Sequence, residues 1–119
     1  KYQIWSQWDQ RVVEMVVDDK LKMNTMEENN ANQLWYKKGS DNAGFELINV
    51  GRHLPLVNGV SKWVYNAEEQ SLKDANPNGH GKFLRRGKSK MDGAGVGLSK
   101  AFSGRNQFVL EMVEIKIEE

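Results

Sequence analysis

The chain of 119 residues is long enough for one sizeable core and too short for two, and its 39% hydrophobic and 28% charged residues are typical of a globular protein. A net charge of +1 excludes a global electrostatic attraction to nucleic acid or to an anionic membrane surface. The absence of cysteine excludes disulfides, thiolate chemistry and cysteine-based zinc sites. This composition fits the cytoplasm or nucleus, and it fits secretion without disulfides equally well.

The printed sequence carries no signal for membrane insertion. No apolar run reaches the roughly 18–20 residues of a membrane span, and residues 1–5 lack the apolar stretch of a signal peptide. Because the first residue is Lys1 rather than Met, we expect a processed product or a domain cut from a longer chain.

The first elements predict a β-hairpin. Residues 11–17 are rich in β-branched side chains, Asp18 and Asp19 interrupt them, and period-two alternation resumes at 21–23. The alternative is a helix over 15–23, which would place both Asp residues in mid-helix without a clean apolar stripe. We therefore predict two strands with a turn at Asp18 and Asp19.

The remaining elements follow from the same signals, alternation for strands and Gly, Pro, Asn and Asp for turns. Asn58 and Gly59 between apolar residues are a strong hairpin signal, and the pattern at Met112 and Val113 predicts a bulge. We expect turns or loops at 18–19, 27–32, 38–44, 51–53, 58–59, 74–81, 91–93 and 103–105. We expect strands at 33–36, 45–50, 54–57, 60–65, 83–84, 96–98 and 107–117.

A Gln-x-apolar pattern recurs along the chain. It stands at Gln33-Leu34-Trp35, Gln70-Ser71-Leu72 and Gln107-Phe108-Val109, each 37 residues from the next, although six Gln in a short chain also allow chance spacing. A fixed period in this range indicates one supersecondary unit repeated. With short strands throughout, it predicts an all-β, pseudo-threefold barrel of three repeats of about 37 residues, forming a single domain over 1–119. The expected repeats are 1–40, 41–76 and 77–119.

This pattern resembles the β-trefoil of the ricin B-chain-like lectins, whose repeats close on Gln-x-Trp. Asn32-Gln33-Leu34-Trp35 matches that motif fully, and Asn106-Gln107-Phe108-Val109 matches it with Val for Trp. The chain is also similar to the cysteine-free lectins of the Euonymus type and to haemagglutinin components of bacterial toxin complexes. The resemblance implies a non-catalytic carbohydrate-binding module without a cofactor, with glycans or glycoproteins as partners; a homodimer stays open.

The resemblance also implies where sugars bind. Family sites use an early Asp, an aromatic platform and an Asn beside the closing Gln, which together supply hydroxyl acceptors, an amide and an apolar ring. Asp18 pairs with Asn32 in the first repeat, whereas the second repeat has Glu69 where Asn is expected. For Asp and Asn in turns, backbone bonding is the alternative role. The expected sugar-binding residues are Asp18, Asn32, Asp92, Phe102, Asn106, Trp63 and Tyr65.

Other repeated residues are expected to be structural. An amide that fixes the same corner three times explains a recurring Gln, and an aromatic residue at a repeated strand position belongs in the core. Of Trp5 and Trp8, beside the opening strand, we expect one to cap the barrel floor. The expected structural residues of the repeat are Gln33, Trp35, Gln70 and Gln107.

Two further hypotheses compete with sugar binding. Residues 82–90 hold five basic side chains, which predict either a solvated hairpin or an anion-binding patch for sulfated glycan or nucleic acid; with no global charge we expect no specific nucleic acid partner. The second alternative is a protein-interaction module, such as an inhibitor or cytoskeletal adaptor, because one fold serves many functions. His53 and His80 stand in different turns without further ligands or a nucleophile, so we expect neither a metal site nor catalysis.

Overall fold

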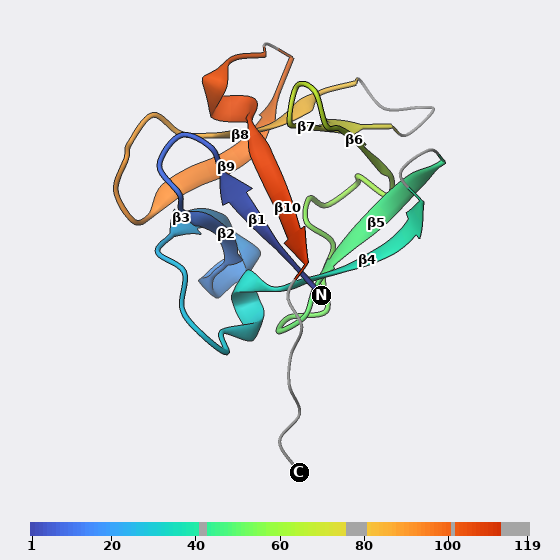
Figure 1. Ribbon diagram of the computed structural model, residues 1–119. Helices are drawn as coiled ribbons and strands as arrows, with labels where there is room; N and C mark the ends of the chain where they lie inside the picture. The colour runs from blue at the N-terminus through green and yellow to red at the C-terminus, as the bar shows by residue number, and fades with distance from the viewer. Residues whose placement is uncertain (41–42, 76–80, 101, 113–119) are drawn as a thin grey trace.

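The computed structural model describes residues 1–40, 43–75, 81–100 and 102–112, and in these residues it contains ten strands, three short 3₁₀ helices and no α-helix (Figure 1). The helices are η1 (Val17–Asp19), η2 (Ala31–Gln33) and η3 (Gly104–Asn106). The strands are β1 (Tyr2–Ser6), β2 (Val12–Met15), β3 (Leu21–Asn24), β4 (Trp35–Ser40), β5 (Gly44–Asn49), β6 (Trp63–Asn66), β7 (Ser71–Asp74), β8 (Phe83–Arg86), β9 (Ala94–Ser99) and β10 (Phe108–Met112). No helix of this described part is long and apolar enough to cross a membrane.

The ten strands form one antiparallel sheet that closes on itself. Their order is β10-β1-β2-β3-β9-β8-β7-β6-β5-β4, and a further pairing of β1 with β4 closes the ring. The first and last described strands lie side by side across the front of Figure 1, with Tyr2 opposite Met112 and Ser6 opposite Phe108. Closure leaves few unpaired strand edges, which stabilises a small all-β domain.

Three core positions of the barrel are equivalent. Trp35 on β4 pairs with Asn49 on β5, Trp63 on β6 pairs with Asp74 on β7, and Phe108 on β10 pairs with Ser6 on β1. Trp35, Trp63 and Phe108 are fully buried in one cluster. The arrangement is a β-trefoil, so the predicted fold is confirmed.

The three repeats differ in length, which the 37-residue period did not predict. Trp63 follows Trp35 by 28 residues, whereas Phe108 follows Trp63 by 45. The strand β7, expected to close the second repeat, instead opens the third, because it pairs with β8 and the Gln70 carbonyl accepts the Phe108 amide. Of the two predicted boundaries between repeats, the one at 76/77 is therefore wrong, because the third repeat begins with β7.

The register of the Gln motif also needs correction. Gln33 ends η2 two residues before Trp35, and the residue that ends η3 two residues before Phe108 is Asn106. Gln107 lies one position further along, and Gln70 lies in the turn before β7 with a φ of 58°. Neither of these two occupies the position of Gln33, so the predicted threefold structural role holds for Gln33 and not for them.

The predicted hairpin around Asn58 and Gly59 is wrong. Residues 54–60 form no strand, and their ladder contact is a single bridge between Ile48 and Pro55. Proline lacks the amide that a ladder requires, and the short second repeat leaves no room for two further strands. Leu56 instead buries its side chain in the core as part of a loop.

Some of the other predicted elements are confirmed, and some lie outside the residues that the structure describes. The β2–β3 hairpin turns at η1 as expected, with Asp18 and Asp19 at positive φ. The barrel is filled by Trp35 and Trp63. Trp5 is half-buried and Trp8 is 36% exposed, so the structure does not support the prediction that one of them caps the barrel floor. The predicted bulge at Met112 and Val113 is not tested, because residues from 113 onward lie outside the described part, as does most of the predicted loop at 74–81.

Candidate functional site

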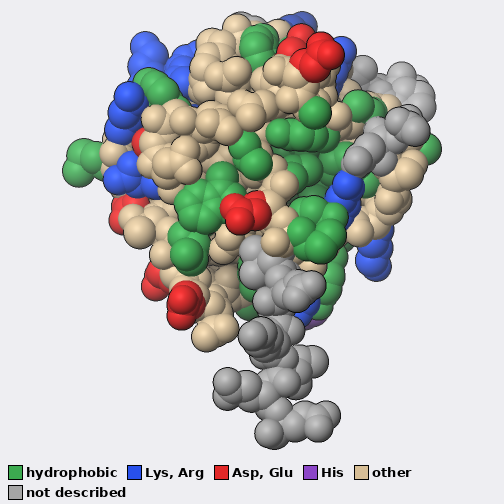
Figure 2. All heavy atoms as spheres, viewed as in Figure 1, with side chains coloured by type: hydrophobic (Ala, Val, Ile, Leu, Met, Phe, Trp, Pro, Cys, Tyr) green, Lys and Arg blue, Asp and Glu red, His purple; other side chains and the backbone are tan. Residues whose placement is uncertain are grey.

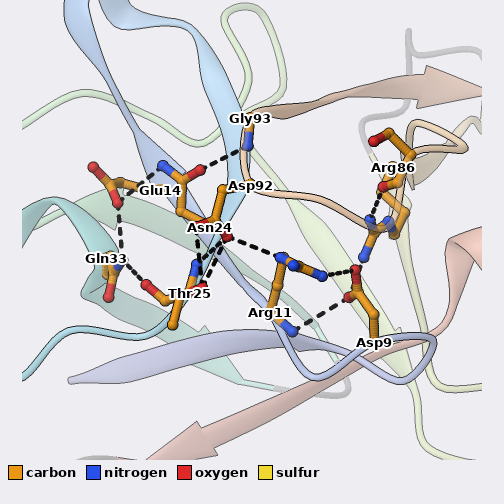
Figure 3. A network of polar contacts seen from close by, with 10 residues as sticks. Asp9, Arg11, Glu14, Asn24, Thr25, Gln33, Arg86, Asp92 and Gly93 are labelled. Atoms are coloured by element: carbon orange, nitrogen blue, oxygen red, sulfur yellow. Dashed lines mark hydrogen bonds and ion pairs between the residues drawn. The ribbon is translucent and has the colours of Figure 1, made fainter.

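A polar network joins the β2–β3 hairpin to the turn before β9, with Asp92 at its centre (Figure 3). The Asp92 carboxylate accepts bonds from the amide of Thr25 at 2.8 Å, from its hydroxyl at 2.9 Å and from Arg11 Nε at 2.9 Å. These bonds from Arg11 and then Thr25 hold the pKa of Asp92 below its ordinary value. Because Asp92 Oδ1 already accepts from three donors, its predicted role as a sugar acceptor is not supported.

The other end of the network fixes the Gln33 amide. Its Nε2 donates to Glu14 Oε1 at 2.8 Å and to the Thr25 carbonyl at 2.9 Å, while its Oε1 accepts the Glu27 amide at 2.8 Å. Figure 3 shows Gln33 and Glu14 meeting on the side of the network away from Asp9. A fully buried amide with both ends bonded is a structural corner.

An ion pair continues the network toward the third repeat. Arg86 on β8 is almost completely buried, and its Nη1 donates to Asp9, which also accepts from Arg11 Nη1 at 2.7 Å. Burial alone would raise the pKa of Asp9, but the bonds from Arg86 and Arg11 outweigh it and leave that pKa below its ordinary value. The prediction that residues 82–90 are a uniformly solvated basic face is therefore wrong at Arg86.

Most of the other predicted sugar residues are committed to the fold. Asn106 is fully buried, donating to the Leu84 carbonyl at 3.1 Å and accepting the Ser103 amide at 2.7 Å. Trp63 is a core residue, so the predicted second-repeat pocket does not form around it. The half-buried Tyr65 donates its hydroxyl to the Phe108 carbonyl at 2.7 Å, and burial raises the pKa of that hydroxyl.

The first repeat keeps its predicted polar pair apart. Asp18 is exposed in η1 with a φ of 65°. Asn32 is half-buried, and its Oδ1 lies so close to Gly51 that a Cβ there would overlap it. Within the described part of the chain, no hydrogen bond or ion pair joins Asp18 to Asn32. The ion pair in this region is between Arg52 and Asp19, at 3.2 Å.

An open pocket lies elsewhere, between the first and third repeats. We call it the Trp8 pocket, with a volume of about 440 Å³, and it is lined by Trp8, Arg85, Lys88, Ser103, Gly104 and Arg105. Trp8 follows β1, Arg85 stands on β8, and the last three belong to the N-terminus of η3. Figure 1 shows the β1–β2 loop beside the β8–β9 segment, and the Asp9–Arg86 ion pair joins the two segments.

The pocket combines an aromatic wall with cations. Trp8 is 36% exposed, with Lys90 Nζ 4.5 Å and the Arg86 guanidinium 5.3 Å from its ring. Arg85 Nη1 donates to Ser99 Oγ at 3.1 Å, which anchors its guanidinium. Figure 2 shows Lys and Arg side chains gathered at the upper left, in the region of the β8–β9 loop of Figure 1.

Phe102 lies next to this pocket in the sequence. It is 43% exposed, and its ring packs edge-on against Phe83 with centroids 5.5 Å apart. Of the predicted sugar residues it alone is an exposed aromatic, and its role as an aromatic platform stays a prediction. The sequence prediction missed Trp8 and Arg105, because nothing in their own segments links residues so distant along the chain.

A second, smaller hollow provides a comparison. It lies on the outer face of β1 and β10, has a volume of about 250 Å³, and is lined by Trp5, Ser6, Gln7, Gln10, Val109 and Glu111. The Trp5 indole donates to Gln3 Oε1 at 3.1 Å, so it is held by its own strand. This hollow lacks the cations of the Trp8 pocket.

Within the described residues, no group of three or more His, Asp or Glu side chains is placed to hold a metal ion. His53 stands in a turn with a φ of 58°, and His80 lies outside the described part.

The comparisons with known proteins bear on the fold. The chain is similar to the crystal structure of ThreeFoil, a designed threefold symmetric β-trefoil, with a TM-score of 0.74 over 94% of this chain and 98% of that chain. Sequence identity is 14%, so the similarity shows the fold alone. No protein-family model and no curated protein matches the sequence.

Proposed function

We propose that this β-trefoil is a non-catalytic carbohydrate-binding module that binds glycans at the Trp8 pocket. The observation that carries the proposal is a partly exposed indole in the wall of an open pocket of about 440 Å³, flanked by hydrogen-bonding side chains. A sugar needs an apolar surface for its C–H face and polar groups for its hydroxyls, and pockets for small ligands have volumes of about 300–1,000 Å³.

The residues that line the pocket support sugar binding better than the sugar residues that the repeat motif predicted. The Asp92 carboxylate, although exposed, already accepts hydrogen bonds from within the protein, whereas Asn106 and Trp63 are buried. Ser103, by contrast, is exposed at the pocket edge, and Phe102 adds an exposed ring beside it. Sugar recognition is therefore proposed between repeats rather than within each repeat.

A screen against immobilised glycans, followed by titration of the best ligand, tests the proposal. Trp8→Ala should weaken binding by about five- to 150-fold, because stacking of a ligand on an aromatic ring contributes on the order of 1–3 kcal/mol. Trp5→Ala is the matched control, because it also removes an indole near β1, but one that lines the smaller hollow and not the Trp8 pocket.

Gly104→Gln provides a second variant that keeps the fold. Gly104 lines the pocket, and a Cβ there would meet only Gln107 Oε1, at 4.0 Å, so the backbone has room for a larger side chain at the pocket wall. We expect it to abolish binding. Loss of binding in Trp5→Ala with retention in both pocket variants would place the sugar elsewhere. If the folded protein binds no glycan, the remaining interpretations are a protein-interaction module and a polyanion binder that uses residues 82–90.

A further inference from the structure

We infer that the Trp8 pocket selects sugars that carry a carboxylate or a sulfate, because it places the cations Arg85, Lys88 and Arg105 around one indole. This inference rests on the proposed function and names the substrate class of the same site. No acidic side chain lines the pocket. An anion entering it therefore meets attraction without a competing carboxylate.

The charges of these three residues are uncompensated within the described chain. The ion pairs found there use Arg11, Arg52 and Arg86, and no described carboxylate pairs with Arg85, Lys88 or Arg105. Asp9 thus neutralises Arg86 behind Trp8, leaving the pocket lining as the positive surface. Charge–charge attraction near a protein surface is stronger than between the same charges in bulk water.

Arg85 is the residue best prepared to bind an oxyanion. Ser99 Oγ takes one donor of its guanidinium, and its Nε is buried without a partner. A guanidinium has five donors in a planar fork that matches a carboxylate or sulfate with two parallel bonds. Anchoring by Ser99 lowers the entropy lost when that fork binds.

Arg105 and Lys88 also line the pocket and can supply further contacts to an anion. Arg105 belongs to η3, whose first turn is held by a capping box between Ser103 and Asn106. This box fixes the backbone that carries Arg105, while the exposed Lys88 follows β8 on a turn. The Trp8 ring, the anchored Arg85 guanidinium and the two further cations together fit a single acidic sugar unit.

A nucleic acid strand is a less fitting ligand for the same chemistry. Binding a strand along its backbone requires a groove that tracks several phosphates, whereas this cationic site is one pocket on a protein of net charge +1. Recognition of one or two anionic groups predicts a shallow dependence on salt, because few counterions are released.

The test is calorimetric titration of the full chain with four probes. These are a sulfated heparin disaccharide, a disaccharide containing glucuronate, neutral cellobiose and inorganic sulfate, with a single-stranded oligonucleotide as competitor. The variants are Arg85→Gln and Arg105→Gln, and the matched control is Lys38→Gln, an exposed cation on β4.

We expect at least one acidic disaccharide to bind more tightly than cellobiose and than inorganic sulfate. Each pocket variant should weaken it at least tenfold, the size of one charge-assisted hydrogen bond, and Lys38→Gln should leave it within twofold. Circular dichroism of each variant verifies the fold.

Three outcomes would overturn the inference. If cellobiose binds equally well and depends on Trp8 but not on the two Arg residues, acid selectivity fails while sugar binding stands. If no sugar binds to the folded protein, the proposed function itself fails. If the oligonucleotide or inorganic sulfate binds as tightly as the acidic disaccharide, the pocket recognises the anion and not the sugar.

Discussion

Replacing Arg86 by Met should destabilise the protein severely, although Arg86 belongs to the basic run of residues 82–90 in the sequence. The substitution keeps most of the side-chain volume and removes the guanidinium that donates to Asp9 and to the carbonyls of Gly87 and Ser89. The Asp9 side chain is 7% exposed, so its carboxylate would lose its most buried partner without gaining full access to water.

The magnitude follows from what Asp9 retains. Removing one partner of a buried ion pair costs about 3–5 kcal/mol. Arg11 still holds Asp9 at 2.7 Å, which favours the lower end, about 3 kcal/mol. For a domain of this length that corresponds to a fall in Tm of roughly 10 °C.

Urea denaturation at pH 7 measures the effect, with Arg52→Met as the control. Arg52 pairs with Asp19 at 3.2 Å on the surface, where an ion pair contributes about 0–1 kcal/mol. A loss below about 1 kcal/mol in Arg86→Met would refute the argument that the buried pair needs both partners.

The effect also depends on pH. The pKa of Asp9 in the folded protein lies below its ordinary value of 3.8, so the ion pair stabilises the fold above that value. This stabilisation is lost as the pH falls through the folded pKa. The difference between wild type and Arg86→Met should therefore shrink in acid, and a difference that stays constant down to pH 3 would contradict the assignment.

Two further variants test the structural roles assigned to predicted site residues. Gly51→Ala should destabilise by about 1–3 kcal/mol in thermal denaturation, because its Cβ overlaps Asn32 Oδ1, and Asn32→Ala in the same chain should restore part of the loss. Asp92→Asn should lower Tm, because it weakens the bonds from Thr25 and Arg11, yet leave glycan affinity unchanged. Loss of binding in a folded Asp92→Asn variant would return that carboxylate to the sugar site.

Local signals in the sequence predicted the first hairpin and the first repeat corner. The hairpin of β2 and β3 follows from β-branched strands around Asp18 and Asp19, which tolerate the positive φ of its turn. Gln33-Leu34-Trp35 marked a true corner because the buried amide and the core indole are neighbours in sequence. Each of these features is decided within a few residues.

The positions of the other two repeats could not be found from a fixed period. The second repeat lacks the inner hairpin that the first repeat has, so Trp63 follows Trp35 by only 28 residues. The Gln spacing therefore does not mark equivalent corners. The better signal was the recurring aromatic residue that opens a closing strand. Barrel geometry requires a large side chain there, whereas several amide side chains can fill the preceding corner.

The burial of Arg86 could have been predicted from strand alternation, but its charge suggested a surface position. Leu84 and Arg86 stand two residues apart on β8, so strand alternation places both on the same face, and Leu84 is a core residue. Counting five basic residues as one surface overlooked this periodicity. The partner, Asp9, lies in another repeat and no local pattern identifies it.

The Trp8 pocket depends on closure of the barrel. Its walls come from the β1–β2 loop and from β8 and η3, which belong to opposite ends of the chain. Pairing of β1 with β10 brings these ends together, and the Asp9–Arg86 pair fixes one loop against the other strand. Because the pocket forms only where the first and third repeats meet, no single repeat contains it, and a motif search within repeats could not have located the site.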